Sequence, residues 1–293
     1  MKAAYVSAVI IIIVIAAFFF LSQSKQQQET YSVSPEGIVT YTNRLSAQFR
    51  VVSESMEGDT IVKRVEFESR GGAISGVLRI PKSTVALPAF VILPGATVPA
   101  GTNLEQDLNK LGFITLGLDQ RGVGQTKAQP ASIQEDFVAF LNSNEPAHHK
   151  MFYDALRAVD ILEGLPEVNK DKIYTGGESM GARFAIMAAA VEPSVKGVLA
   201  ISTSGFGFEQ MQDRGQREFV RSIDPDNYIT KLAGRPVIFI HGDEDPVIPI
   251  AMGRALFEKA QGPKEFMEVK AKGHGYGPQE MFPVISQKLE GWK

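Results

Sequence analysis

The sequence predicts an α/β protein with a doubly wound, mostly parallel sheet, preceded by a membrane-spanning helix. Short apolar runs and longer helix-like segments alternate from residue 59 to the C-terminus, which is typical of strands joined by crossover helices. Composition agrees, because 293 residues of which 44% are hydrophobic and 22% are charged suffice for one sizeable core. We find no internal repeat, so 59–293 is expected to form a single domain.

The expected elements of this domain follow one another along the chain. An antiparallel opening hairpin is expected over 61–68 and 73–80, with glycines 71 and 72 between its strands. Further strands are expected at 90–93, 114–118, 173–175, 198–202, 237–240 and 266–269. Helices are expected near 103–111, 152–162, 182–191, 250–260 and 279–289. This alternation makes the core of the sheet parallel.

Two insertions, 125–147 and 204–234, interrupt the alternation. Because segments that follow strand ends lie over the active site in such folds, we expect them to act as lids or pocket walls. Phe206, Phe208 and Met211 in the second insertion could line an apolar pocket or pack into the core. The sequence leaves these two alternatives open.

The N-terminal region has a different composition. Residues 3–21 carry no charge and are about as long as the roughly 20 apolar residues that span a bilayer, whereas a cleavable signal core has about 7 to 15. We therefore expect residues 1–24 to be a single-pass anchor that holds the domain of residues 59–293 outside the cytoplasm. The small residues at 22–24 leave cleavage and secretion open. Residues 25–58 are expected to form a polar tether and an N-terminal arm.

Composition argues against several kinds of partner. The net charge of −3 gives no indication of nucleic-acid binding. The chain has no cysteine, which excludes a disulfide, a thiolate metal site and a cysteine nucleophile. The adjacent His148 and His149 have no carboxylate or cysteine at ligand spacing, so no metal site is expected. We expect no cofactor, and the oligomeric state stays open.

The segment 177–181 predicts a nucleophile. It reads Gly-Glu-Ser-Met-Gly, the G-x-S-x-G spacing, and lies between a strand-like run and an alanine-rich helical run. A serine at such a junction occupies a sharp turn, and a helix N-terminus lies directly behind its hydroxyl. Ser179 is therefore the candidate nucleophile.

Two later loops supply candidates for an acid and a base. Asp243 and Asp245 follow one apolar strand-like run, and His274 follows the next. Because all these loops follow strand ends, in the order serine, acid, histidine, the groups are expected to meet at one sheet edge. His274 would remove the proton of Ser179, and a carboxylate would fix the histidine tautomer.

An oxyanion also needs two backbone N–H donors. Met180, the residue after the nucleophile, is expected to supply one of them. The other should come from the turn that follows the buried strand 89–93, where Ala96 is the first candidate and Thr97 the next.

Four motifs together resemble the α/β-hydrolase superfamily. They are the segments 119–124, 177–181, 241–249 and 273–275. The resemblance covers roughly residues 60–293. Within it, two segments are similar to the dienelactone hydrolase and prolyl-oligopeptidase-like branch, which includes small esterases and serine aminopeptidases; they are 153–158 and 164–168. It implies that Arg121 ties down local carbonyls or a carboxylate.

The resemblance also implies a catalytic triad of Ser179, Asp245 and His274, since the Pro-Val-Ile-Pro that follows Asp245 is similar to the acid loop of this superfamily. Asp243 would instead shape the turn. His241 would be a packing or loop-fixing residue that can support the acid loop through a hydrogen bond.

The sequence therefore predicts a serine hydrolase that cleaves a small-molecule ester through an acyl-enzyme on Ser179. An ester is favoured over a peptide because its leaving group demands less of the general acid, and we find no site for a peptide terminus. A serine peptidase or aminopeptidase, an acyltransferase and a non-catalytic α/β-hydrolase-like binding protein remain alternatives.

Overall fold

The computed structural model describes residues 29–44, 46–232 and 234–293. It separates into two compact units. The smaller holds most of a two-stranded sheet formed by β1 (Thr30–Val33) and β2 (Val39–Thr42). The expected membrane-spanning helix, residues 3–21, lies outside the described residues. None of the helices that are described is long and apolar enough to cross a membrane.

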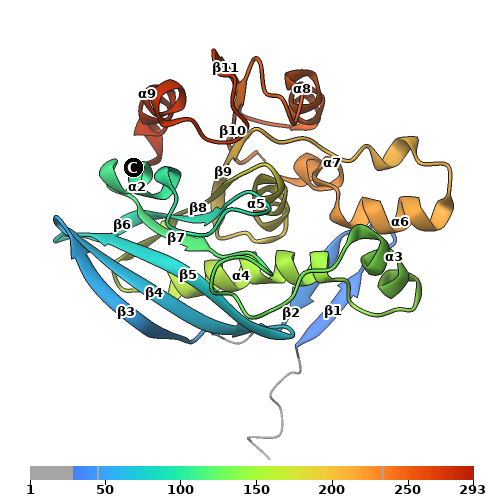
Figure 1. Ribbon diagram of the computed structural model, residues 1–293, viewed down its shortest axis with the longest axis horizontal. Helices are drawn as coiled ribbons and strands as arrows, with labels where there is room; N and C mark the ends of the chain where they lie inside the picture. Colours follow the sequence, from blue (N-terminus) through green and yellow to red (C-terminus); the bar gives the residue numbers. More distant parts are fainter. Residues whose placement is uncertain (1–28, 45, 233) are drawn as a thin grey trace, which may run out of the picture. The chain divides into compact units, whose positions relative to one another are not determined.

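The larger unit is built on a nine-stranded sheet in the order β11-β10-β9-β8-β6-β7-β5-β4-β3 (Figure 1). Its antiparallel side comprises β3 (Phe49–Glu57), β4 (Thr60–Ser69) and β5 (Gly72–Pro81). Its parallel side comprises β6 (Leu87–Leu93), β7 (Ile114–Leu118), β8 (Val168–Glu178), β9 (Val195–Ile201), β10 (Val237–Gly242) and β11 (Lys264–Val269). Strand β5 joins the two sides by pairing antiparallel to β7. The predicted mostly parallel α/β sheet is confirmed.

Helices cover the sheet on both faces. The α-helices of the described residues are α2 (Asn103–Lys110), α3 (Ile133–Leu141), α4 (Ala147–Gly164), α5 (Met180–Val191), α6 (Arg214–Ile223), α7 (Pro225–Tyr228), α8 (Ile250–Lys259) and α9 (Pro278–Lys288). Of these, α3, α6 and α7 pack mainly on other helices. Tyr174 of β8 packs with α2 and α9 in the main core cluster, whereas its neighbour Thr175 donates a hydrogen bond to a carbonyl of α5. Because successive strand residues point to opposite faces, these helices lie on opposite sides of the sheet.

Local sequence explains why these elements form. The central strand β6 is apolar throughout and buried from Pro88 on, as expected for a strand covered on both faces. Helix α2 begins with a capping box in which Thr102 accepts from the N–H of Glu105 and Glu105 accepts from the N–H of Thr102. Because β6 and β8 pair in parallel, the loops that follow them lie at the same edge of the sheet.

Candidate active site

Ser179 stands at the junction of β8 and α5 in a strained backbone conformation. Its φ is 52° and its ψ −119°, in the positive-φ region that residues with a side chain seldom adopt. A Cβ added to Gly177 or Gly181 would lie 2.3 Å or 1.9 Å from the carbonyl oxygen of Leu93. Both glycines are therefore required by the close approach of β6, and together they permit the sharp turn expected for 177–181.

The strained serine is held from the neighbouring strand. Its N–H donates to the carbonyl of Ile201 at 2.9 Å, and its carbonyl accepts from the hydroxyl of Thr203 at 2.8 Å. A conformation of this kind costs about 1–3 kcal/mol and persists only when its surroundings fix it. The end of β9 supplies that support for Ser179.

Asp245 and His274 form a hydrogen-bonded pair. The two carboxylate oxygens lie 3.0 and 2.9 Å from Nδ1 of His274, and one also accepts from the N–H groups of Val247 and Ile248. Burial would raise the pKa of Asp245, but the hydrogen bonds from Ile248, His274 and Val247 bring it below its ordinary value. Because a carboxylate only accepts, Nδ1 of His274 carries the proton and Nε2 keeps its lone pair.

The rival acid makes different contacts. Asp243 accepts from the N–H of Ala271 at 3.1 Å and lies 2.5 Å from Nζ of Lys270. It therefore ties the loop after β10 to the loop after β11. Among the described residues no hydrogen bond joins Ser179 to His274, so the pair of Asp245 with His274 is the part of the expected relay that is connected.

Glu178 is a site residue that sequence reasoning missed. Its half-buried carboxylate accepts from the N–H of Tyr276 at 2.8 Å, and a Cβ on Gly275 would lie 2.7 Å from the same oxygen. Burial raises the pKa of Glu178, while that hydrogen bond and the proximity of His274 lower it. The carboxylate thus connects the serine turn to the histidine loop. A charged residue between the glycine and serine of the motif was the signal in the sequence.

His241 fixes the acid loop, which confirms the expected role. Its Nε2 lies 2.8 Å from the carbonyl of Ile248 and must donate to it. The ring is fully buried, and a Cβ on Gly253 would lie 2.5 Å from its Nδ1. Burial lowers the pKa of His241 below its ordinary value, although the hydrogen bond to Ile248 and the charge of Asp245 oppose this shift. The ring therefore stays neutral at neutral pH.

Arg121 also has the structural role implied by the sequence. Its guanidinium donates two hydrogen bonds of 2.8 Å to Asp154 and one of 2.8 Å to the carbonyl of Arg70. Both charged partners are buried. These contacts fasten the loop after β7 to α4.

The two candidate oxyanion donors line one cavity. Ala96 and Met180 lie on the wall of a cavity of about 520 Å³, together with Thr97 and His148. A Cβ on Gly95 would lie 4.0 Å from Cβ of Ser179, so the turn after β6 runs directly beside the serine. The cavity is therefore the candidate substrate pocket.

The insertions contribute unequally to this pocket. Pro130 and Ala131 of the first insertion line it. In the second insertion, Phe206, Phe208 and Met211 instead pack against a core cluster on α6. Of the two alternatives left open by the sequence, the structure shows core packing for these side chains.

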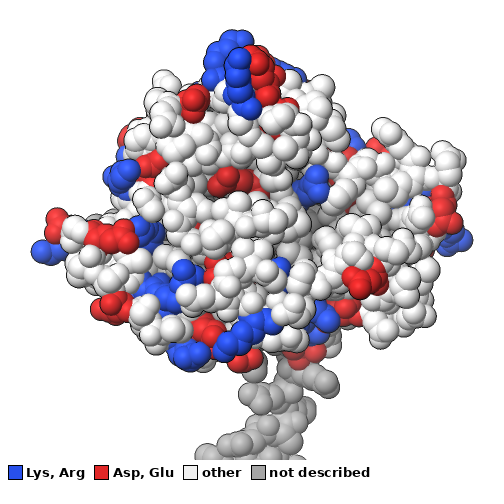
Figure 2. Space-filling view, in the orientation of Figure 1, with Lys and Arg blue, Asp and Glu red and all other residues white. Residues whose placement is uncertain are grey.

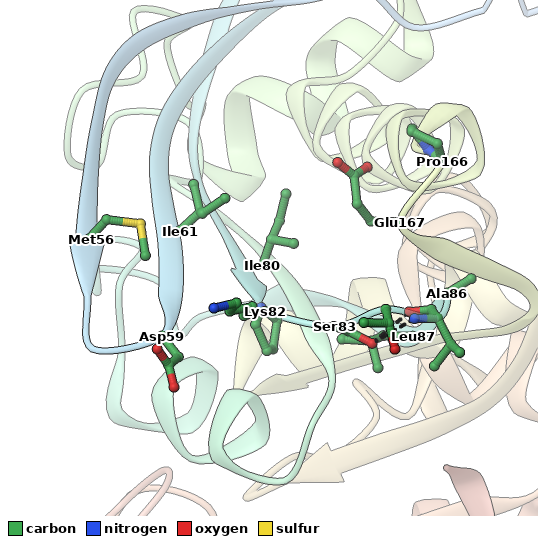
Figure 3. A pocket seen from close by; sticks show the side chains of 13 residues that line it. Met56, Asp59, Ile61, Ile80, Lys82, Ser83, Ala86, Leu87, Pro166 and Glu167 are labelled. Carbon is green, nitrogen blue, oxygen red and sulfur yellow. Dashed lines mark hydrogen bonds between the residues drawn. The ribbon is translucent and has the colours of Figure 1, made fainter.

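A second, larger cavity lies at the opposite edge of the sheet. Its volume is about 620 Å³, and its walls include Ile61, Ile80 and the loop 82–86, which precedes β6 (Figure 3). Glu167, which precedes β8, also lines it. Catalytic groups at the carboxyl ends of these strands cannot reach this cavity, and none of the predicted site residues lines it.

Charged side chains do not form one dominant patch on the face in Figure 2. Lysine, arginine, aspartate and glutamate of both signs gather mainly around its rim, and its middle is largely uncharged. Such a surface exerts little long-range attraction on a highly charged ligand.

The fold and the Gly-Glu-Ser-Met-Gly turn define the class of protein, an α/β hydrolase. Residues 41–217, more than half of the chain, match the acetyl xylan esterase (AXE1) family, and the chain belongs to that family. The predicted superfamily is thereby confirmed, and its branch is narrowed to this family.

Solved structures agree on the fold. The acetyl xylan esterase of Paenibacillus sp. R4 is similar with a TM-score of 0.73 and 20% identity, over 85% of this chain and 90% of that one. Acetyl xylan esterase 1 of Thermoanaerobacterium sp. JW/SL YS485 is similar with a TM-score of 0.69 and 19% identity, over 83% of this chain and 87% of that one.

Curated relatives match over shorter stretches. YtaP of Bacillus subtilis (strain 168), provisionally named a hydrolase, is 30% identical over 105 residues, which are 36% of this chain and 34% of that protein. Human alpha/beta hydrolase domain-containing protein 17B is 29% identical over 157 residues, 50% of this chain and 53% of its own. The chain thus spans about a third to a half of the length of these relatives.

Proposed function

We propose that the protein is a serine esterase with Ser179 as nucleophile, His274 as general base and Asp245 as the acid that orients it. The observation that carries this proposal is the Asp245–His274 pair, which lies after β10 and β11 at the sheet edge where β8 ends in the strained serine. With Nδ1–H held by Asp245, Nε2 of His274 is free to accept the proton of the attacking hydroxyl.

In the proposed reaction, Ser179 Oγ attacks the ester carbonyl while His274 takes its proton. The N–H groups of Met180 and Ala96 hold the oxyanion, which is supported by their place on one cavity wall beside the serine. The imidazolium then protonates the leaving alcohol, and water attacks the acyl-enzyme by the same route.

The proposed substrate is a small-molecule ester with a short acyl group. The family name points to acetyl esters, and the largely apolar wall of the 520 Å³ cavity suits a small acyl group. A peptide terminus would need a free charge to recognise it. Arg121, the cation on that wall, is already occupied by Asp154.

The proposal includes location. Residues 3–21 are proposed to anchor the protein in a membrane as a single span, with the hydrolase domain outside the cytoplasm and secretion as the alternative.

A fluorophosphonate probe tests the proposed function, since it labels only an activated serine. We expect the full chain to be labelled, and Ser179→Ala and His274→Ala to lose labelling. The matched control is Ser83→Ala, a serine that lines the other cavity, which should label like wild type. A well-folded wild-type protein that stays unlabelled and hydrolyses no aryl acetate would favour the binding-protein alternative.

A further inference from the structure

The described chain contains a second pair in which a carboxylate orients a histidine. Nδ1 of His148 lies 2.5 Å from Asp136 of α3. The same carboxylate accepts from the N–H groups of Ala147 and His148, at 2.6 and 2.7 Å. It thereby caps α4, for which the preceding Pro146 provides no side-chain cap.

These contacts determine which nitrogen of His148 is free. Asp136 is buried, and although burial would raise its pKa, the hydrogen bonds from His148 and Ala147 bring it below its ordinary value. The group is therefore an acceptor-only carboxylate, and Nδ1 of His148 must donate to it. In this Nδ1–H tautomer the lone pair lies on Nε2, which makes no hydrogen bond within the described residues.

The free nitrogen belongs to a side chain in the candidate substrate pocket. His148 lines the 520 Å³ cavity together with Met180 and Ala96. Arg121, on the same wall, has its guanidinium occupied by Asp154 and the carbonyl of Arg70. Most other lining residues are apolar or glycine. A hydrogen-bond acceptor held rigidly in an otherwise apolar pocket fixes the orientation of a ligand.

The neighbouring histidine does not share this arrangement. His149 is fully buried, and its Nε2 lies 2.7 Å from the hydroxyl of Ser222. Burial lowers the pKa of His149 to about 3, so this ring is a neutral structural group. The two adjacent histidines thus serve different purposes, which the sequence could not separate.

We propose that His148 is a specificity-determining residue whose Nε2 accepts a hydrogen bond from a hydroxyl group of the bound ester. The inference rests on the proposed esterase function and adds to it a preference for hydroxylated esters. The hydroxyl can belong to the acyl group or to the alcohol, and both present the same O–H donor to the acceptor.

Isosteric ester pairs test this preference. On the acyl side, phenyl glycolate is compared with phenyl propionate, and on the alcohol side, 2-hydroxyethyl acetate is compared with propyl acetate. In each pair an O–H replaces a methyl group. The measured quantity is the ratio of kcat/KM within a pair, which is then compared between wild type and variants, so that the intrinsic reactivity of the esters cancels.

Two substitutions separate the roles of the ring nitrogens. His148→Asn keeps an N–H donor for Asp136 but removes the acceptor at the position of Nε2. His148→Gln places an amide near the position of Nε2. We expect His148→Asn to lower the preference for the hydroxylated ester by roughly tenfold in one of the two pairs, the effect of one hydrogen bond, because the kcat/KM of the hydroxylated ester falls more than that of the plain ester. His148→Gln should restore part of the preference.

The outcomes are distinguishable. An unchanged preference in His148→Asn overturns the inference, as does an equal loss for both members of a pair, which would indicate a structural role or a role as general base. The pair that responds identifies the acyl or the alcohol side. If wild type is labelled by a fluorophosphonate but the kcat/KM ratio within both pairs is the same in wild type and in His148→Asn, only this inference fails. If it neither hydrolyses plain esters nor is labelled, the proposed function fails, and the inference with it.

Discussion

At the scale of single residues, the site depends on close backbone approaches that tolerate no substitution. Cβ atoms on Gly177 and Gly181 would lie 2.3 and 1.9 Å from the carbonyl oxygen of Leu93. A Cβ on Gly275 would lie 2.7 Å from the oxygen of Glu178 that accepts from the N–H of Tyr276. Gly275 has a φ of 84°, so it is fixed by conformation as well as by space. The glycines near Ser179 and His274 thus allow the strands and loops of the candidate site to approach one another closely.

Gly181→Ala is expected to destabilise the fold strongly. The new Cβ would lie 1.9 Å from the carbonyl oxygen of Leu93, which belongs to a central strand and cannot move freely. We expect a loss of about 3 kcal/mol or more in the free energy of unfolding, measured by urea denaturation. Gly164→Ala is the matched control, because no atom lies within 4 Å of its Cβ position, and it should change stability by less than about 1 kcal/mol. Equal effects of the two variants would contradict the steric argument.

Asp245→Asn is expected to lower kcat by about 10³ to 10⁴-fold. The magnitude is that known for the same change in the chymotrypsin triad, where the amide no longer fixes the productive histidine tautomer. Asp243→Asn is the control, since that carboxylate contacts Lys270 and Ala271 instead of His274. Asp243→Asn should lower kcat by less than about tenfold. The assignment of the acid would be reversed if Asp243→Asn were the more damaging change in steady-state kinetics.

Residues of the site differ in how far the sequence could predict them. Ser179 and the pairing of Asp245 with His274 follow from order along the chain, because the ends of successive parallel strands meet at one edge. Glu178 and His148 could not be assigned in this way. Their roles depend on Tyr276 and Asp136, whose proximity arises only from tertiary packing.

At the scale of elements, the histidine loop is held by two anchors on different parts of the fold. Glu178 accepts from the N–H of Tyr276, and the hydroxyl of Tyr276 donates to Asp107 of α2 at 2.7 Å. The loop that carries His274 is thereby fastened to both β8 and α2. We regard Glu178 as a positioning residue for this reason.

Glu178→Ala is expected to lower kcat by roughly tenfold with little change in KM. The variant leaves the N–H of Tyr276 without its acceptor and lets the loop carrying His274 shift, and small misplacements of catalytic groups are costly. Glu178→Gln keeps a carbonyl acceptor in the same position and should retain most of the activity. If both variants lost activity equally, the charge of Glu178 would matter and the positioning role would be wrong.

The capping box of α2 predicts a pH dependence of stability. Burial raises the pKa of Glu105 from 4.5 to about 7, against the opposing hydrogen bonds from Thr102 and Gly101. Above pH 4.5 the unfolded state has lost this proton while the folded state still holds it, so stability falls as pH rises to about 7. The expected loss is on the order of 2–3 kcal/mol, visible as falling urea midpoints between pH 5 and pH 8.

Glu105→Gln should remove most of this pH dependence, because the side chain can no longer ionise. Glu135→Gln is the matched control, since Glu135 occupies the same position in the capping box of α3 but is exposed, with its pKa lowered by the hydrogen bonds from Ser132. It should leave the fall between pH 5 and pH 8 intact. If the fall in stability between pH 5 and pH 8 persisted unchanged in Glu105→Gln, it would have to come from the ionisation of another group.

Elements with strong local signals were predicted well, and those defined by distant partners were not. The opening hairpin was expected at 61–68 and 73–80, and its strands occupy Thr60–Ser69 and Gly72–Pro81. Helix α6 was not predicted. Its apolar face packs against Phe137 and Phe140 of α3, some eighty residues earlier, and a partner at that distance leaves no local pattern.

At the scale of the whole molecule, the topology separates two cavities that composition cannot distinguish. The smaller cavity lies at the carboxyl ends of β6 and β8, next to Met180, and the larger lies at the start of the same strands. Volume alone would favour the larger cavity as the substrate pocket. In an open α/β sheet the reacting groups gather beyond the carboxyl ends of the strands, so topology favours the cavity of about 520 Å³ as the candidate substrate pocket.

The proposed anchor predicts where the whole protein resides. Expressed in a bacterium, the full chain should sediment with membranes and resist extraction by carbonate, because an uncharged run such as 3–21 is stable in the bilayer. A chain that begins at residue 29 should be found in the soluble fraction. Ile12→Lys, which places a charge in the middle of the run, should weaken membrane association, since a central lysine costs about 2.5–3.5 kcal/mol on insertion scales.

Protease added to spheroplasts determines the orientation. It should digest the hydrolase domain of the anchored chain while sparing a cytoplasmic marker protein, because the domain is proposed to lie outside the cytoplasm. Recovery of a shortened chain from the periplasm or the medium would instead establish cleavage after residues 22–24 and secretion. Protection of the domain in intact spheroplasts would contradict both locations, and a substrate inside the cell would then have to be considered.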